Sequence, residues 1–377
     1  MSQTIHARRI SAGPAPRVEV EVADAPVWFD SNLPLVLTPD AIVAAFLLVC
    51  AHNERGMTVD APLTARFNEN LKQLSPIFHD FWKYEPVPLV EPLGEDRPPP
   101  GSLATPFKSA ALMFSGGVDS FYSLLRGSVL PSALVMVEGF DIPLTQPART
   151  AAAWNSLAIV ASHLGLQPVK VTTNLREHTL FRTLDWEVSH GGALAAVGHL
   201  LAEHFSHLLI SSSNSYRDAT KPWGSHFRID PLWSSDSMAI LHVGATHRRS
   251  DKLIAIADEP LVQHNLRVCW EGNSSRMNCG TCEKCLRTQL VLYAAGKLDR
   301  FTTFEGDAST LLQTVRSLPF VKNRLTLAGT YARFAESNSS SELGREVAKL
   351  IRRSNHQHIR RALGKSLVGR SLSRLLR

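Results

Sequence analysis

The sequence lacks the long apolar segments typical of membrane-spanning or exported chains. Its longest apolar run, Ala41–Cys50, is well short of the roughly 18–20 residues that a transmembrane helix needs. The first residues, Met1–Pro16, contain no apolar core of the type found in secretory signal peptides. From these two absences we expect a cytoplasmic protein in which Ala41–Cys50 forms a buried helix.

Cysteine is scarce and unevenly placed. Of the five cysteines, Cys50 stands alone in the apolar run, and the other four lie within the 17 residues from Cys269 to Cys285. This distribution argues against a disulfide framework spread over the chain. In a cytosolic protein, a cluster of this kind favours a metal site. We interpret Cys50 as a core residue.

Excess charge is missing from most of the chain. The formal net charge is +6, but residues 341–377 hold ten Lys or Arg and only two acids, so the rest of the chain sums to about −2. This near-neutral body makes a small molecule a better partner than a nucleic acid. We expect a basic helical tail over 336–377 that docks on the body or aids solubility. An anionic membrane surface or RNA is the alternative partner for the tail, although without aromatic residues it cannot stack on bases.

Hydrophobic residues make up 44% of the chain, enough for a sizeable core. We expect residues 1–16 to be unstructured. The region up to residue 105 is predicted to be a small N-terminal α+β domain that ends in a Pro-rich linker, Leu93–Pro106. Its expected elements are strands at Arg17–Val22, Met57–Asp60 and Pro86–Val90, and helices at Thr38–Cys50, capped by Thr38, and Ala65–Lys83.

From Ser109 onward, strand patterns alternate with helix patterns. The expected strands are Ala110–Phe114, Leu134–Val137, Pro168–Thr172, His207–Ser211 and Ala239–Val243, and the expected helices are Val118–Gly127, Ala148–Leu164 and Gly191–His204. The alternation predicts an α/β domain over 106–335, built on a doubly wound parallel sheet with helices on both faces. Ligands bind such sheets at the carboxyl ends of the strands. We expect His190–Gly192 to form a glycine turn that caps its helix, with an anion-binding nest near the substrate as the alternative.

The segment Ser115-Gly116-Gly117-Val118-Asp119-Ser120 has the features of a phosphate-binding loop. It follows an apolar strand and opens a helix. Two glycines allow a sharp turn and a close approach of the backbone to an anion, and the helix directs its positive end to the same place. The Asp119 carboxylate suits this position if Mg²⁺ links it to the phosphates. The rival interpretation is an ordinary strand–turn–helix.

This hexapeptide resembles the PP-loop of the ATP-pyrophosphatase superfamily. The resemblance implies the HUP-type α/β fold, ATP held by its pyrophosphate, and cleavage between the α- and β-phosphates. It also implies that Val137, at the end of the second strand, contacts adenine, and that Ser212 and Asn214, after the fourth strand, lie near the ribose and α-phosphate. All six loop residues are then ATP-binding, and Asp119 and Ser120 are catalytic.

Cys269, Cys279, Cys282 and Cys285 present four thiols, three of them at two-residue gaps. Four thiolates make a closed tetrahedral zinc site, which is structural rather than catalytic. We expect this zinc to staple a C-terminal helical segment, with an iron–sulfur cluster or a sulfur-carrying catalytic cysteine as alternatives. The spacing is similar to that of 7-cyano-7-deazaguanine synthase-like proteins, over residues 109–295. Residues 1–100 have no counterpart there, and Arg287 stands one place early.

The segment 217–236 is dense in polar groups and follows a strand, so we expect it to lie near the substrate. Lys221, His226 and Arg228 are the candidate catalytic residues, because cations neutralise a leaving pyrophosphate and a histidine moves protons. The alternative is a solvated loop anchored by tryptophans. Arg248 and Arg249 are interpreted as part of a solvent-exposed face.

Together these features predict an enzyme that uses ATP, Mg²⁺ and Zn²⁺. It would adenylate a carboxyl or carbonyl oxygen of a small molecule, release pyrophosphate, and support amide- or nitrile-type ligation. Three alternatives stay open: a tRNA-modifying thiolase, an epimerase of a cell-wall precursor that works through carboxylate adenylation, and a non-catalytic nucleotide-binding scaffold.

Overall fold

The computed structural model describes residues 4–10, 13–90, 107, 109–218, 221–269, 271, 277–305 and 307–375, with the backbone alone at 90, 325 and 362–375. The predicted linker Leu93–Pro106 lies outside the described residues. The chain divides into two compact units, Met1–Lys252 and Leu253–Arg377. This division differs from the predicted one, because the region before residue 105 shares a unit with the strands that follow it.

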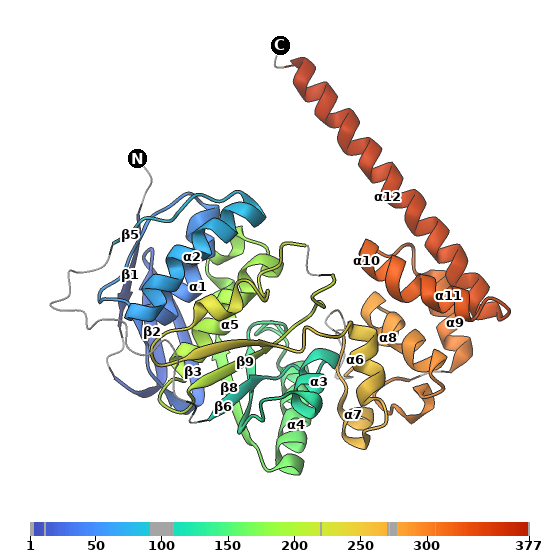
Figure 1. Ribbon diagram of the computed structural model, residues 1–377, viewed down its shortest axis with the longest axis horizontal. Coiled ribbons are helices and arrows are strands. Elements are labelled where there is room, and N and C mark those ends of the chain that lie inside the picture. Colours follow the sequence, from blue (N-terminus) through green and yellow to red (C-terminus); the bar gives the residue numbers. More distant parts are fainter. Residues whose placement is uncertain are drawn as a thin grey trace. The chain divides into compact units, whose positions relative to one another are not determined.

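The first unit is built on one ten-stranded sheet (Figure 1). Its strands, in the order in which they lie, are β10 (Ala239–Val243), β9 (His207–Ser211), β6 (Ala110–Met113), β7 (Ala133–Glu138), β8 (Gln167–Thr173), β3 (Ala25–Leu35), β2 (Ala15–Val22), β1 (Ile5–Arg9), β4 (Met57–Thr58) and β5 (Leu89–Val90). The pairs from β10 to β8 are parallel, as predicted. The sheet as a whole is mixed, since β3 pairs antiparallel with β8, with β2 next to it and then β1.

The antiparallel part depends on a tight hairpin that the sequence patterns did not indicate. Ala23 and Asp24, between β2 and β3, both have positive φ angles, 48° and 63°. Such angles suit a two-residue hairpin turn, which is usually signalled by Asn-Gly or Asp-Gly. Without that signal, β3 was not predicted. The interpretation of residues 1–16 as unstructured was also wrong, because β1 and the start of β2 lie there.

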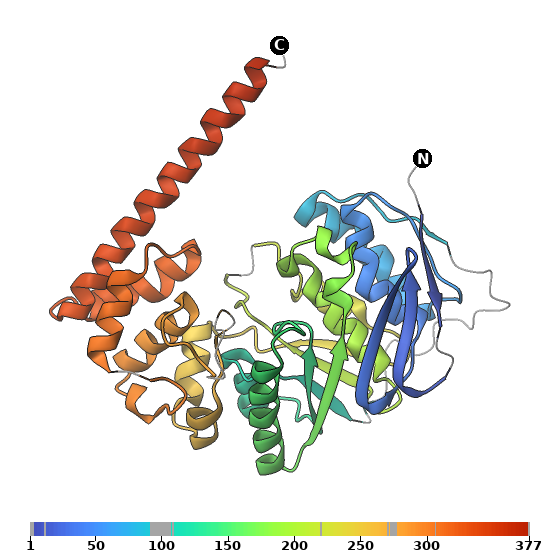
Figure 2. The same ribbon diagram turned by 180° about the vertical axis from the view of Figure 1, so that it is seen from behind.

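Helices cover both faces of the sheet (Figures 1 and 2). The helices of the first unit are α1 (Pro39–His52), α2 (Ala65–Trp82), α3 (Val118–Arg126), α4 (Pro147–Leu164), α5 (Trp186–Leu200) and the start of α6 (Arg249–Ile256). Short 3₁₀ turns occur at Leu175–Glu177, Phe181–Thr183 and Asp230–Trp233. Thr38 caps α1 as predicted, since its Oγ1 accepts from the Ala41 N–H at 3.2 Å.

The order of the strands fixes where the chain changes direction. From β6 the chain passes through α3 to β7 and through α4 to β8, then returns through α5 to β9 on the other side of β6. Right-handed crossovers in opposite directions put α5 on the opposite face from α3 and α4. The point where the order reverses, at the carboxyl ends of β6 and β9, is the usual ligand-binding crevice of such a sheet.

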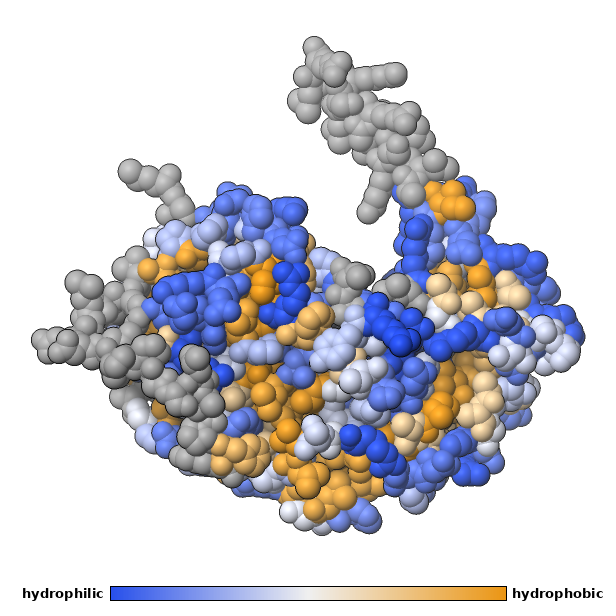
Figure 3. All heavy atoms as spheres, viewed as in Figure 1, coloured by the Kyte–Doolittle hydropathy of each residue, from blue (hydrophilic) through white to orange (hydrophobic). Residues whose placement is uncertain are grey.

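On the outer side of this architecture, α4 carries apolar side chains at the surface. Ile159 and Leu164 are both exposed, and Figure 3 shows apolar atoms gathered over this region of the face in view. A large hydrophobic core lies on the other side of the sheet, where α1 packs closely against α5.

Glycine makes the packing of α1 against α5 possible. Gly192 was expected in a turn, but it lies inside α5. A Cβ on Gly192 would meet the Ala44 carbonyl oxygen of α1 at 2.3 Å, and one on Gly191 would meet the Gly224 carbonyl oxygen at 2.0 Å. These distances are too short for any side chain, so the two glycines set the separation between α5 and its neighbours.

The second unit is helical in its described part. Besides the end of α6, its helices are α7 (Pro260–Asn265), α8 (Glu283–Ala294), α9 (Ala308–Ser317), α10 (Arg324–Thr326), a π-helical turn at Leu327–Tyr331, α11 (Ala332–Ser337) and α12 (Glu342–Leu375), with a 3₁₀ turn at Leu298–Arg300. The predicted basic tail is one helix, α12. Its first turns dock through Leu343, Val347 and Leu350, which are buried in the core of this unit. No described helix is both long and apolar enough to cross a membrane.

Replacing Gly192 by alanine should destabilise the first unit by about 1–3 kcal/mol, the usual cost of overpacking, because α1 and α5 must move apart. Gly329→Ala is the matched control, since a Cβ there meets nothing within 4 Å. Urea unfolding followed by tryptophan fluorescence measures the effect, because six of the seven tryptophans precede residue 253. Equal midpoints for Gly192→Ala and the unmodified protein would contradict this account of the helix pair.

Candidate functional site

The loop between β6 and α3 has the geometry of an anion-binding turn. Gly116 adopts the left-handed conformation, with φ of 72°, which a side chain would disfavour. Gly117 is the N-cap of α3, and its N–H donates to Ser115 Oγ at 3.3 Å. Ser120 Oγ donates to the Gly117 carbonyl oxygen at 3.0 Å. The predicted strand, turn and helix are confirmed, with Val118 as the first helical residue.

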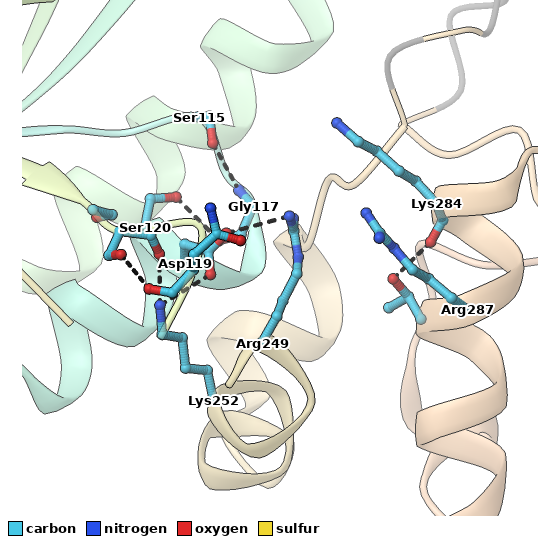
Figure 4. Close-up of polar contacts among 12 residues, drawn as sticks. Ser115, Gly117, Asp119, Ser120, Arg249, Lys252, Lys284 and Arg287 are labelled. Carbon is cyan, nitrogen blue, oxygen red and sulfur yellow. Dashed lines mark hydrogen bonds and ion pairs between the residues drawn. The ribbon is translucent and has the colours of Figure 1, made fainter. Parts of the chain in front are cut away.

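Asp119 is the charged centre of this loop, and its side chain is only 12% exposed. Its Oδ1 lies 3.2 Å from Lys252 Nζ, and its Oδ2 lies 3.3 Å from Arg249 Nη1 (Figure 4). Lys252 also donates to the Ser212 carbonyl oxygen at 2.6 Å. One lysine therefore ties the loop after β6 to the loop after β9, across the point where the strand order reverses.

Lys252 is an unusual cation, because its side chain is 1% exposed. Burial lowers the pKa of its ammonium group, and the charge and hydrogen bond of Asp119 oppose that shift only in part. Around Asp119, two cations surround one carboxylate, so the loop carries a local positive excess. Such an excess favours an anionic ligand.

The pairing of α6 with the loop was not predicted. Lys252 is 133 residues away from Asp119 in the chain, and no local motif marks it. The interpretation of Arg248 and Arg249 as a solvent-exposed face was wrong for Arg249, which pairs with Asp119. Arg248 holds Asp218 through two hydrogen bonds of 3.0 and 3.1 Å. Only proximity in the folded chain reveals these partners.

The other residues expected to contact ATP lie at the same edge of the sheet. Val137 is next to last in β7, and Ser212 follows β9; these strands are the two neighbours of β6. The Ser212 N–H donates to the Val243 carbonyl oxygen, and its hydroxyl donates to the Asn214 carbonyl oxygen at 2.5 Å. The fold thus brings Val137, Ser212 and Asn214 to the edge that carries the phosphate loop.

The three residues predicted in the 217–236 segment have other partners. Arg228 pairs with Asp80 of α2 at 2.8 Å, and Lys221 lies 3.9 Å from Glu187 of α5. His226 is buried against the Phe81 and Phe227 rings. These contacts hold the segment on α2 and α5, and none of them joins Lys221, His226 or Arg228 to Asp119.

The four clustered cysteines of the second unit come together as predicted. Their sulfurs all lie within 4.8 Å of one another, and Cys279–Cys285 and Cys269–Cys282 are each separated by 3.9 Å. Four ligands about 2.3 Å from a tetrahedral metal lie roughly 3.8 Å apart. The cluster can therefore hold a metal ion such as zinc.

Backbone groups prepare the cysteine cluster for a metal. The Cys282 N–H points to Cys279 Sγ at 3.3 Å, and the Cys285 N–H to Cys282 Sγ at 3.5 Å. Gly280 has a positive φ of 76°, which permits the tight turn. The buried Asn278 side chain accepts from the N–H groups of Val268 and Cys269, so it fixes the segment that carries the distant fourth thiol. The role of Asn278 was not predicted.

Without a metal, the four thiols cannot all ionise. The sulfur of Cys269, together with burial, raises the pKa of Cys282 to about 12, and neighbouring sulfurs and burial also raise the pKa of Cys285. A bound metal reverses this effect because it stabilises thiolates.

Comparisons with known proteins do not assign the chain to a family. No protein-family model matches it, no curated protein matches it, and no solved structure matches it. The interpretation of the site therefore depends on its own residues.

Replacing Cys285 by serine should remove the tightly bound metal, because three thiolates no longer close the site. Cys50→Ser is the matched control, since Cys50 is buried in α1, away from the cluster in sequence. Elemental analysis after gel filtration should give about one metal ion per chain for the unmodified protein and the Cys50 variant, and far less for Cys285→Ser. An unchanged metal content in Cys285→Ser would contradict the four-cysteine site.

Proposed function

We propose that this protein binds ATP at the Ser115–Ser120 loop and cleaves it to AMP and pyrophosphate while it adenylates a small-molecule substrate. The observation that carries the proposal is the loop itself. It lies where the strand order reverses, its Gly116 is left-handed, and its Asp119 is flanked by Lys252 and Arg249. Helix N-terminal N–H groups and two cations at one turn suit a polyphosphate.

Lys252 and Arg249 have a definite role in this proposal. The departing pyrophosphate gains negative charge as the bond to the α-phosphorus breaks, and cations already in place stabilise that charge without reorganisation. Lys252 is well suited because its ammonium group is buried, and the attraction between two charges is stronger in the protein interior than in water. We assign this role to Lys252 and Arg249 in preference to Lys221 and Arg228, whose partners lie on other elements.

The Mg²⁺ that accompanies ATP fits this loop through one carboxylate, as Mg²⁺ sites in ATP-using enzymes commonly do. Both oxygens of Asp119 pair with cations, so one must be released to hold the ion. Arg249 is the more exposed of the two partners. It would turn from Asp119 to the phosphates, whereas Lys252 would stay in place.

The reaction that we propose has two steps. A carboxyl or carbonyl oxygen of the substrate attacks the α-phosphorus of ATP, and pyrophosphate leaves with the bonding electrons. A nucleophile then attacks the activated carbon, and AMP leaves. Residues 1–340, whose formal charges sum to about −2, favour a small-molecule substrate over a nucleic acid.

We also propose that the four cysteines hold zinc in a structural role. All four positions of a tetrahedral site are filled by thiolates, which leaves none for a water or a substrate. Cys279 and Cys282 lie in the turn before α8, Cys285 lies in its first turn, and Cys269 lies after α7. Zinc would therefore join the start of α8 to the segment that follows α7.

Phosphorus NMR of the protein with Mg²⁺–ATP and a desalted pool of small metabolites tests the reaction. We expect AMP and pyrophosphate to appear in equal amounts, because the α–β bond is the one broken. ADP and phosphate would overturn the proposal. Fractionation of the pool would then identify the substrate.

Replacing Lys252 by methionine should lower the rate of AMP formation by about 10²–10³-fold, as removal of one preorganised donor does elsewhere. Lys72→Met is the matched control, because Lys72 is an exposed lysine whose partner is Glu69 on the same helix. The Lys72 variant should keep the full rate. Circular dichroism at each assay temperature checks that the Lys252 variant is folded. A folded Lys252→Met protein with an unchanged rate would exclude this residue from the site.

A further inference from the structure

A second group of polar side chains lies at the same edge of the sheet and has no role in phosphate binding. His242 is next to last in β10, and Asp230 begins the 3₁₀ turn that packs beside this strand. His242 Nδ1 lies 2.7 Å from Asp230 Oδ2, and the two side chains are 4% and 0% exposed. A buried histidine and carboxylate this close form an oriented pair.

The Asp230 carboxyl group accepts hydrogen bonds from two other groups. Ser225 Oγ donates to its Oδ2 at 2.6 Å, and the His226 N–H donates to its Oδ1 at 3.2 Å. A carboxylate can only accept, so a hydrogen bond to it from His242 uses a proton on Nδ1. The other nitrogen, Nε2, has no hydrogen-bond partner among the described residues. This is the arrangement of a histidine that accepts a proton.

Other buried histidines of the same unit have different partners for their ring nitrogens. His199 uses both ring nitrogens, one toward the Trp233 carbonyl oxygen and one toward Ser235 Oγ. One ring nitrogen of His178 has no partner within the described ranges, but the other contacts the Val22 carbonyl oxygen in the apolar core. His242 differs from both, because a carboxylate orients it and it lies at the carboxyl end of a strand.

The strand register places His242 two strands away from β6, the strand that leads into the Ser115–Ser120 loop. Leu209 of β9 pairs with Leu112 of β6 on one side and with Leu241 of β10 on the other. Neighbouring strands lie about 4.8 Å apart, so β10 is roughly 10 Å from β6 at this level. The residue after His242, Val243, bonds Ser212, whose carbonyl oxygen accepts from Lys252. A substrate that spans this distance would reach from the α-phosphate to His242.

The elements packed against this pair supply further polar groups. His190 of α5 lies near enough to Asp230 to feel its charge, and its Nδ1 contacts the Trp186 carbonyl oxygen. The Trp223 indole N–H beside His190 is buried and has no hydrogen-bond partner in the part of the chain that the structure describes. Gly224 allows the chain to pass close to α5, where a Cβ would lie 2.2 Å from the Val188 carbonyl oxygen. The Trp223 N–H is a donor and His242 Nε2 is an acceptor, and neither has a partner among the described residues. Two such groups in one region suit a polar ligand.

We propose that His242 is the general base of the second step and that Asp230 is its positioning residue. The inference rests on the proposed adenylation. A nucleophile with an N–H or O–H bond attacks the activated carbon, and its proton passes to His242 Nε2. The bond between the carbon and the AMP oxygen breaks, and AMP leaves with that electron pair. The imidazolium then returns the proton to solvent.

Two assays on one protein separate the steps. Exchange of labelled pyrophosphate into ATP, supported by the desalted metabolite pool, reports the first step, and net AMP release reports both. His242→Gln should keep exchange within about threefold of the unmodified protein but lose about 10²–10⁴-fold in AMP release, the usual contribution of general-base catalysis. Hydroxylamine, which attacks without a base, should restore AMP release. His52→Gln, an exposed histidine of α1, is the control and should behave as the unmodified protein.

Asp230→Asn tests the positioning role by a readout that does not need substrate. Nitrogen-15 NMR of the labelled histidines should show His242 with its proton on Nδ1 in the unmodified protein and a different tautomer in the variant. A proton on Nε2 in the unmodified protein would overturn the proposal. So would unchanged AMP release in a folded His242→Gln protein, or loss of exchange together with release. Absence of exchange in the unmodified protein would instead overturn the adenylation proposal, and this inference with it.

Discussion

The contact between Lys252 and Asp119 is the interaction on which the account of the site depends. It joins α6 to the loop after β6, and through the Ser212 carbonyl oxygen it reaches the loop after β9. Burial lowers the pKa of Lys252, so its ammonium form is less favoured here than in water. Removing one member of a buried pair is costly, because it leaves the other charge unpaired. A polyphosphate would supply the anionic charge that this position lacks.

The topology explains why these groups meet. Because β6 lies between β7 and β9, the chain leaves it in one direction and returns on its other side, and the connecting helices take opposite faces. The carboxyl ends of β7, β6, β9 and β10 then form one edge. That edge receives the glycine loop, Ser212 and His242 from segments that are far apart in sequence. The antiparallel strands β3, β2 and β1 extend the same sheet and place α1 and α2 over its other end, so the N-terminal region is a structural part of this unit.

Much of the fold followed from sequence patterns, because those patterns are local. Apolar runs such as Ala110–Phe114 predicted the parallel strands, and β9 and β10 were predicted to the residue. The cysteine spacing predicted the metal-ligating cluster for the same reason. The β2–β3 hairpin was missed because Ala23 and Asp24 turn the chain without a glycine.

The candidate site was less predictable, since its main contacts are long-range. The loop glycines stand together in the sequence, but Lys252 and Arg249 become partners of Asp119 only through the fold. Similarly, Lys221, His226 and Arg228 carry suitable groups in a suitable segment, yet their side chains are directed to α2 and α5. His242 lies in a predicted strand, and no local pattern links it to Asp230, which is 12 residues away in the chain.

The claim that the Ser115–Ser120 loop is a polyphosphate site can be tested without knowing the substrate. Calorimetric titration with inorganic pyrophosphate, in the presence of Mg²⁺, measures binding to the loop directly. We predict saturable binding at one site per chain that is lost in Gly116→Val, because a β-branched residue cannot adopt the left-handed turn and close the loop around an anion. Gly165→Val, at a left-handed glycine after α4, is the control for backbone strain elsewhere. No binding to the unmodified protein, or equal binding to Gly116→Val while it is folded, would contradict the account.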